Sequence, residues 1–326
     1  MKLKQIVEGL LTEAKSREEL AAELVKAFKA GPAATRAFLD SPDGSSDTAR
    51  KDILLSPDQD GDDPDDVVQV GSASGTAMGF LPTQSEIDLM KSVSYPLGSV
   101  ETMVSAINKA VAAGIVVSDN LVIDGHHRWS GAIAIGGNKA QVSGKDVKWP
   151  GSSATEKLAA AQLAIAAKLG PGKKTPSQAK GFKTNIMGKG AGAIAKMIMA
   201  NVNKQTDPNA PGALLNDAMM QELTAGENKN LPIVMKWLDK YGDRVEASEN
   251  KIGQLRQAIA MKVAANLQEL PDNPEAPARK DMPQFDDKVG GPDLKTVTPA
   301  LTGKAGGFNI SPPFVKDGII KLKDLI

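Results

Sequence analysis

The chain is organised around Asn120-Leu-Val-Ile-Asp-Gly-His-His-Arg-Trp-Ser-Gly-Ala-Ile-Ala-Ile135. Its first part, residues 121–123, is a short aliphatic run that predicts a buried strand. Asp124 and Gly125 break this run, and the apolar pattern that returns after Arg128 predicts a short helix. A strand, a glycine turn and a helix start bring unpaired backbone N–H groups together at one point, where they can bind an anion. The stretch therefore predicts a phosphate-binding turn.

The side chains of this turn suggest phosphate binding, proton transfer or metal binding. The guanidinium of Arg128 can bind a phosphate through a pair of parallel hydrogen bonds. His126 and His127 are the only histidines of the chain, and their imidazoles could transfer a proton or bind a metal. Adjacent residues point in different directions, so the rings are poorly placed to chelate one metal ion together. A turn with a purely structural role is the alternative interpretation.

The run Asp124-Gly-His-His-Arg128 resembles the signature turn of the ParB/sulfiredoxin superfamily, in particular the phage-encoded ParB-like nuclease domains and the ADP-dependent free serine kinases. Upstream, Leu81-Pro-Thr-Gln-Ser-Glu-Ile87 is similar to the Pro-x-Gln segment of that domain. The resemblance spans residues 67–149. The chain has no cysteine, which excludes sulfiredoxin chemistry. The Glu-Arg-Arg form of the turn and the helix-turn-helix of partition ParB proteins are also missing, which argues against a CTP-gated clamp.

The resemblance implies a phosphate-binding role for Gly125, His126, His127 and Arg128, with Gln84 as a polar group on the opposite side. The implied ligand is a nucleotide such as ATP, ADP or CTP, or a nucleic acid.

The resemblance also implies catalytic residues, namely His126, His127 and Glu86. Glu86 is included because a glutamate acts as base in the serine kinases. Asp124 would orient a histidine or contact a magnesium ion, which is the expected metal cofactor.

The distribution of charge suggests a further partner, although the chain as a whole has 39 basic and 39 acidic residues. Residues 40–66 contain ten aspartates, and we expect a solvated acidic linker there, rather than a calcium loop. Residues 157–206 contain nine lysines and no acidic residue. This surface is expected to bind nucleic acid, or else to be simply solvated. The candidate contacts are Lys173, Lys174, Lys180, Lys183 and Lys189.

The predicted fold class is α+β. We expect a helical hairpin at 1–39 with a capping box at Ser16 and Glu19, the acidic linker at 40–66, and a small ParB/sulfiredoxin-like α/β domain at 67–150. A helical, lysine-rich domain at 151–270 and an extended tail at 271–326 follow. In detail, the pattern predicts a helix at 2–14, a strand at 67–70 before the glycine- and serine-rich residues 71–79, a helix starting at Ser85, a helix capped by Ser99 and one continuous helix at 243–269. No apolar run is long enough for a membrane span, so no membrane partner and a cytoplasmic location are expected, in a host cell or a virion if the protein is phage-encoded.

Three functions remain open at this point. The favoured hypothesis is a phosphotransfer enzyme: a nuclease or nucleotide hydrolase, or a phosphotransferase like the free serine kinases. The alternatives are a nucleic-acid-binding or nucleotide-binding module without catalysis, and a structural protein, for instance of a phage particle, that assembles with itself or with other structural proteins.

Overall fold

The computed structural model describes residues 70–148 and 181–279 apart from 206, 227 and 247, together with scattered residues between 15 and 46 and between 153 and 158. One compact unit comprises residues 1–70, 147–179 and 280–326, and a second comprises 71–146 and 180–279. Several predicted features lie outside the described residues: the helix at 2–14, most of the acidic stretch, the tail from residue 280, and Lys173, Lys174 and Lys180. The capping box is confirmed, because Glu19 N–H donates to Ser16 Oγ (3.2 Å) and Ser16 N–H to Glu19 Oε2 (2.8 Å).

The second unit contains a mixed five-stranded sheet in the order β1-β5-β3-β4-β2. Strand β4 pairs in parallel with β2 and antiparallel with β3, while β3 and β5 are parallel. With the helices described below, this sheet confirms the predicted α+β class. The strands are β1 (Val70–Thr76), β2 (Leu81–Pro82), β3 (Val111–Ser118), β4 (Leu121–Asp124) and β5 (Gln141–Val147).

Strand β1 covers Val70 and the glycine- and serine-rich residues that follow it, where the sequence pattern predicted no strand. It is an edge strand of small residues, and η2 (Ala77–Gly79) follows it. Ala73 of β1 is buried at 6% exposure and Ala77 of η2 at 0%, so both contribute a methyl group to the core. A run of glycine, serine and alanine lacks the alternation of large apolar residues that marks a strand in sequence, which is why the sequence pattern did not predict a strand beyond residue 70.

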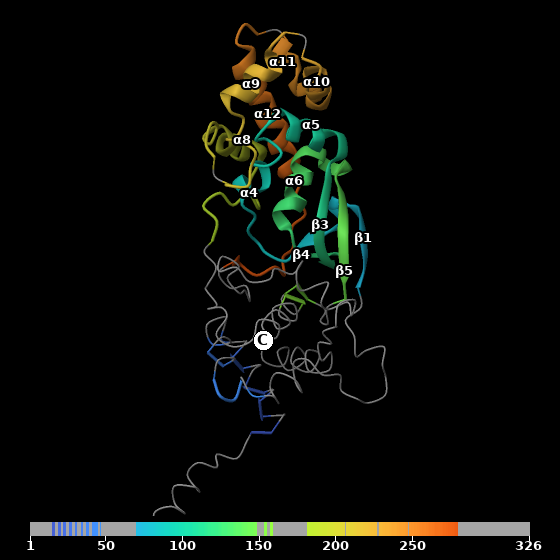
Figure 1. The fold of residues 1–326 in the computed structure, drawn as a ribbon, viewed down its shortest axis with the longest axis vertical. Helices are drawn as coiled ribbons and strands as arrows, with labels where there is room; N and C mark the ends of the chain where they lie inside the picture. The colour runs from blue at the N-terminus through green and yellow to red at the C-terminus, as the bar shows by residue number, and fades with distance from the viewer. Residues whose placement is uncertain are drawn as a thin grey trace, which may run out of the picture. The chain divides into compact units, whose positions relative to one another are not determined.

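The central helix is α6 (His126–Gly136), which follows β4 directly and lies beside the sheet in Figure 1. Its Trp129 is fully buried and donates from Nε1 to the carbonyl of Ala77 at 2.8 Å. Two shorter helices lie close to it, α4 (Leu89–Val93) and α5 (Val100–Lys109), and η3 (Gly137–Lys139) continues it. Ser99 caps α5 through Thr102 N–H, as predicted.

Helix α4 begins four residues later than the sequence predicted, at Leu89 with Asp88 as its cap. The backbone before it is engaged in long-range hydrogen bonds. Ser85 N–H donates to the carbonyl of Pro277 (3.0 Å), and Ile87 N–H donates to Asn185 Oδ1 (3.0 Å). These bonds hold residues 85–87 outside the helix, and no local sequence pattern indicates them.

The helices after residue 190 belong to the same compact unit as the sheet, so this unit crosses the boundary predicted near residue 150. Two side chains of these later helices donate hydrogen bonds to backbone carbonyls at the carboxyl end of α6. Trp237 Nε1 donates to the carbonyl of Ile135 (2.7 Å), and Asn266 Nδ2 donates to that of Ala134 (2.9 Å). The helices after residue 190 are α8 (Ala191–Met199), α9 (Asp217–Thr224), α10 (Leu231–Leu238), η4 (Asp239–Tyr241), α11 (Asp243–Glu246) and α12 (Lys251–Leu267).

The single helix predicted at 243–269 is two helices, α11 and α12. Asn250 caps α12 by accepting from Gly253 N–H (3.0 Å), and its own N–H donates to Ser248 Oγ (3.1 Å). Polar side chains that bond to the nearby backbone in this way compete with helical hydrogen bonds, so they interrupt a helix despite a continuous apolar stripe.

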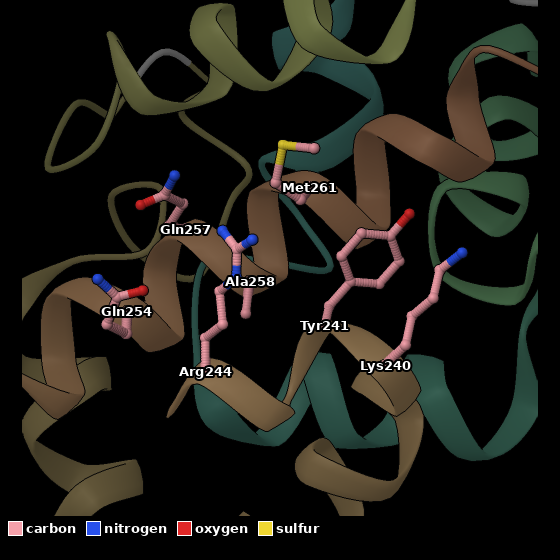
Figure 2. Close-up of a pocket in the computed structure, with 7 residues that line it drawn as sticks. All are labelled: Lys240, Tyr241, Arg244, Gln254, Gln257, Ala258 and Met261. Carbon is pink, nitrogen blue, oxygen red and sulfur yellow. The ribbon is translucent and has the colours of Figure 1, made fainter. Parts of the chain in front are cut away.

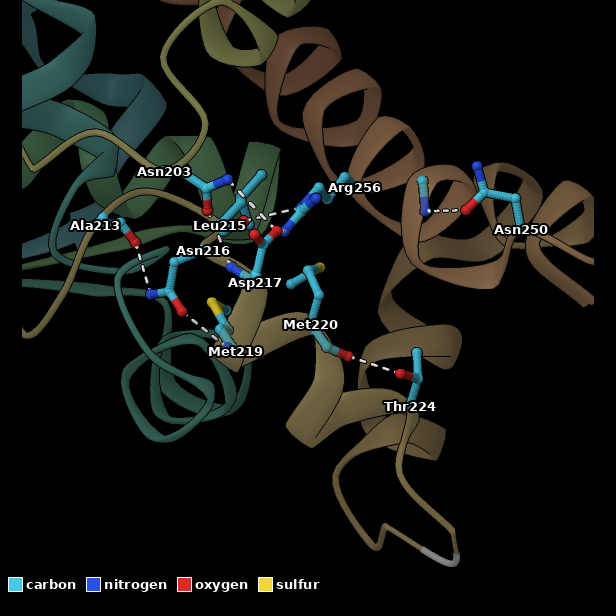
Figure 3. Close-up of polar contacts among 11 residues, drawn as sticks. Asn203, Ala213, Leu215, Asn216, Asp217, Met219, Met220, Thr224, Asn250 and Arg256 are labelled. Atoms are coloured by element: carbon cyan, nitrogen blue, oxygen red, sulfur yellow. Dashed lines mark hydrogen bonds and ion pairs between the residues drawn. The ribbon is translucent and has the colours of Figure 1, made fainter.

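Helix α9 is joined to α12 by polar contacts, shown in Figure 3. Asn216 caps α9 through Met219 N–H (2.9 Å) and donates to the carbonyl of Ala213 (2.9 Å). Arg256 of α12 forms an ion pair with Asp217 and donates from Nε to the carbonyl of Leu215 (3.0 Å).

Among the helices of the described residues, none combines the length and the apolar character needed to cross a membrane.

Candidate functional site

The predicted turn forms where β4 ends and α6 begins. Gly125 is the residue before the helix and has φ +93°, and a Cβ there would lie 2.8 Å from Ile115 Cγ2. Glycine is therefore required both by the backbone conformation and by the available space. The N–H groups of Arg128 and Trp129 donate to the carbonyl of Gly125 at 2.9 Å each. The N–H groups of residues 126 and 127 precede these bonds and are the ones that a helix start leaves for an anion.

His126 points into the protein, against the Pro-Thr-Gln segment. It is 7% exposed, and its Nε2 accepts the backbone N–H of Thr83 at 3.1 Å. Thr83 Oγ1 lies 3.2 Å from the same nitrogen and donates to the carbonyl of Val122 at 2.7 Å. Burial and the charge of Arg279 lower the pKa of His126 to about 3, so the ring is neutral at pH 7. In this geometry the ring joins two segments, and it does not lie at the anion position where the sequence analysis placed it.

His127 lies at the helix start with its ring edge against Phe182, at a centroid distance of 5.4 Å. Its Nε2 is buried and has no hydrogen-bond partner among the residues that the structure describes. Burial lowers the pKa of His127 to about 3, with further contributions from the neighbouring imidazole of His126 and from the charges of Lys91, Arg279 and Arg128. The ring is thus a neutral group with an unsatisfied nitrogen, surrounded by cations.

Arg128 folds back over the turn. Its Nη2 forms an ion pair with Asp124 Oδ2 at 3.2 Å, and both side chains are about a third exposed, at 37% and 33%. Its Nε is buried and, within the described part of the chain, has no hydrogen-bond partner. Asp124 therefore already faces a cation from this helix. No group of three or more His, Cys, Asp or Glu side chains that could hold a metal occurs among the described residues, and magnesium at Asp124 stays a prediction.

Gln84 and Glu86 come close to the turn but face other segments. Gln84 is 3% exposed, and its Oε1 accepts from Arg279 Nη1 at 3.2 Å. Glu86 Oε2 accepts the backbone N–H of Phe182 at 2.8 Å. These contacts bring residues 181–182 and Arg279 to the turn, and they give Glu86 a role in holding the backbone there.

Sequence reasoning missed three residues of this site, namely Lys91, Phe182 and Arg279. Arg279 Cζ lies 4.3 Å from the centroid of the Phe182 ring, and Lys91 Nζ lies 5.3 Å from it. Both distances are typical of cation–π contacts. The one signal in the sequence was Phe182 itself, the only aromatic residue in the lysine-rich stretch 157–206. Lys183 and Lys189, which were predicted to bind nucleic acid, are exposed in this same segment.

A groove of about 820 Å³ runs beside α6, lined also by residues of α4, α5 and β3. Lys91, His127 and Arg128 line it near the start of α6, and Ile135 lines it near the end. At 1.5 Å per residue, this stretch of helix is about 12 Å long. The remaining lining is largely apolar, with Glu101, Lys109 and Asp207 as its other charged members.

Comparison of the chain with protein-family models, with curated proteins and with solved structures finds no match. The function is therefore inferred from the residues and their geometry.

Proposed function

We propose that the groove beside α6 binds a nucleotide, with its phosphates at the first turn of the helix. The observation that carries this proposal is a pair of buried nitrogens, His127 Nε2 and Arg128 Nε, which lack partners among the described residues and belong to side chains lining one groove. Buried polar groups normally have hydrogen-bond partners, and a group left without one is unfavourable. Both nitrogens are buried, so the two side chains would turn toward the groove to donate to a phosphate oxygen, with the proton of the neutral His127 ring on Nε2.

The charges around the turn favour an anion. Lys91, Arg128 and Arg279 all lower the pKa of His127, so each lies close enough to act on the same small volume. Lys91 and Arg128 also line the groove itself. The unpaired N–H groups and the positive end of the helix dipole add to their effect. Asp124 offsets part of this charge, but its ion pair is partly exposed and therefore weak.

The size and lining of the groove suit the rest of a nucleotide. Ligand pockets in proteins commonly enclose about 300 to 1,000 Å³, and this groove has about 820 Å³. Its apolar walls, which include Pro96, Ala106, Val111 and Ala132, would receive a base or sugar. A phosphate at His127 would leave about 12 Å of α6 for the remainder of the ligand.

Binding is supported better than hydrolysis. A general base works best when its pKa is near the working pH, and His127 has a pKa of about 3. His126 is bonded to Thr83, and Glu86 to the backbone of Phe182. The nuclease, hydrolase and serine-kinase-like activities with magnesium therefore remain predictions, as does nucleic-acid binding by Lys183 and Lys189.

A thermal-shift screen of ATP, ADP, CTP and GTP, with and without magnesium, tests the proposal. A ligand at about 100 times its Kd stabilises the native state by about 2.7 kcal/mol, which is a rise of several degrees in Tm. We expect such a rise with at least one nucleotide, and we expect Lys91→Gln and Arg128→Gln to reduce it. Lys139→Gln is the matched control, because Lys139 is exposed, follows the far end of α6 and does not line the groove.

A rise in Tm that is the same in the Lys91→Gln and Arg128→Gln variants would disprove this site, as would no rise with any of the nucleotides. Released phosphate, and cleavage of a DNA duplex, are measured in the same samples. Turnover that disappears with Arg128→Gln would extend the proposal from binding to catalysis.

A further inference from the structure

We propose a second ligand site, for a small phosphate monoester, between α12 and the short helices η4 and α11. A pocket of about 290 Å³ lies there, and Figure 2 shows Lys240, Tyr241 and Arg244 on one side of it and the residues of α12 on the other. It shares no lining residue with the groove beside α6, so this proposal does not depend on the first.

The charged side chains that line the pocket are both positive. Lys240 and Arg244 line it, and none of its lining residues is a carboxylate. Lys240 Nζ lies 5.5 Å from the centroid of the Tyr241 ring, and Lys262 Nζ lies 6.0 Å from it. In the described part of the chain, none of these three cations has an ion-pair partner. Unpaired cations around a concavity concentrate positive potential and attract an anion.

The other lining residues indicate what the anion would be attached to. Gln254 and Gln257 are three residues apart on α12, so their amides lie on the same face of the helix. Amides both donate and accept hydrogen bonds, which suits hydroxyl groups or the edge of a base. Ala258 is buried at 6% exposure and supplies, with Met261, an apolar surface in the same pocket.

The ligand class that fits is a phosphate monoester with further hydrogen-bonding groups. Its phosphate would lie at Lys240 and Arg244, and its remainder would face Gln254 and Gln257. Nucleoside monophosphates and sugar phosphates share this chemistry, and the experiment compares one of each.

The chain offers a site-resolved probe, because it has only two tyrosines. Tyr95 lines the groove beside α6, and Tyr241 lines the second pocket. Full-length protein labelled with 3-fluorotyrosine should show two fluorine resonances, assigned with Tyr95→Phe and Tyr241→Phe. The resonance of Tyr241 is expected to shift on titration with AMP, with ribose 5-phosphate or with both, and not with adenosine or ribose at equal concentration. The second site would be refuted if the Tyr241 resonance does not shift with either phosphate ester, or if it shifts equally with adenosine.

Variants separate the second pocket from the groove beside α6. Arg244→Gln is expected to raise the midpoint of the Tyr241 titration at least tenfold and to leave the Tyr95 titration unchanged. Lys236→Gln removes the same charge from an exposed position outside the pocket and should change the Tyr241 midpoint less than twofold. Equal effects of Arg244→Gln and Lys236→Gln would mean that general charge, and not this pocket, attracts the ligand. A Tyr95 resonance that does not shift during the titration would contradict only the proposed nucleotide site beside α6. The two proposals can therefore fail separately.

Discussion

The Nε2 atom of His126 accepts the backbone N–H of Thr83, 43 residues earlier in the chain, at 3.1 Å. This bond joins the glycine turn to the Pro-Thr-Gln segment that precedes α4. Thr83 is fully buried, and its hydroxyl donates to the carbonyl of Val122 in β4. The imidazole of His126 thus joins the glycine turn to the Pro-Thr-Gln segment, which are separate motifs in the sequence. The imidazole of His127 lines the groove.

Replacing His126 by phenylalanine should destabilise the protein. The change keeps a ring but removes the acceptor, so the buried N–H of Thr83 is left unsatisfied, which costs about 1 to 3 kcal/mol. Urea denaturation followed by circular dichroism measures the loss. An unchanged free energy of unfolding would mean that the Thr83 bond contributes nothing to stability.

The same substitution one residue later should have a different effect. His127→Phe removes a buried Nε2 that has no partner among the described residues, so we expect the free energy of unfolding to stay constant or to rise by about 1 kcal/mol. Nucleotide binding should weaken at the same time, because a proposed phosphate contact is lost. A variant that loses stability as much as His126→Phe, or that binds nucleotide like the parent protein, contradicts this assignment.

Stability should fall as the pH drops below about 6.5. Burial lowers the pKa of His126 and of His127 to about 3, whereas both have the ordinary value of 6.5 in the unfolded chain. Between these values the unfolded state binds more protons, so acid favours unfolding by up to about 1.4 kcal/mol per pH unit for each histidine. Denaturation curves at pH 7, 6 and 5 measure this dependence. The double variant His126→Phe, His127→Phe should lose most of the slope in that range, and a slope that survives would assign the effect to other groups.

Gly125→Ala should be more harmful than Gly188→Ala. Both glycines have positive φ, +93° and +70°, so both substitutions carry a similar backbone cost of about 1 to 2 kcal/mol. Only at Gly125 would the new methyl group also meet neighbours, Ile115 Cγ2 at 2.8 Å and Arg128 Nη2 at 2.9 Å. Overpacking of this kind adds about 1 to 3 kcal/mol. Equal losses of stability in the two variants would show that the turn has room for a side chain.

Local patterns predicted much of the architecture. The apolar run at 121–123 is β4, Ser99 and Ser16 cap helices as expected, and the glycine turn before α6 is where the sequence placed it. These features depend on neighbours within a few residues, which a sequence displays directly.

The candidate site was less predictable, because its parts are distant in sequence. Lys91, Phe182 and Arg279 meet only through the fold, and the cation–π contacts that join them have no local signature. The direction of the His126 ring likewise depends on Thr83, which reaches it through the parallel pairing of β2 with β4. Charge counting highlighted the lysines of 157–206 but could not show that the aromatic ring among them faces the turn.

The carboxyl end of α6 is bonded to Trp237 and Asn266, two side chains more than a hundred residues further along the chain. A fragment cut to residues 67–150 would lack both donors, and the carbonyls of Ala134 and Ile135 would lose these partners. We expect this fragment not to hold α6 in its native position. Ligand binding at the first turn of α6 would then be lost when the sheet is separated from the helices that follow residue 190.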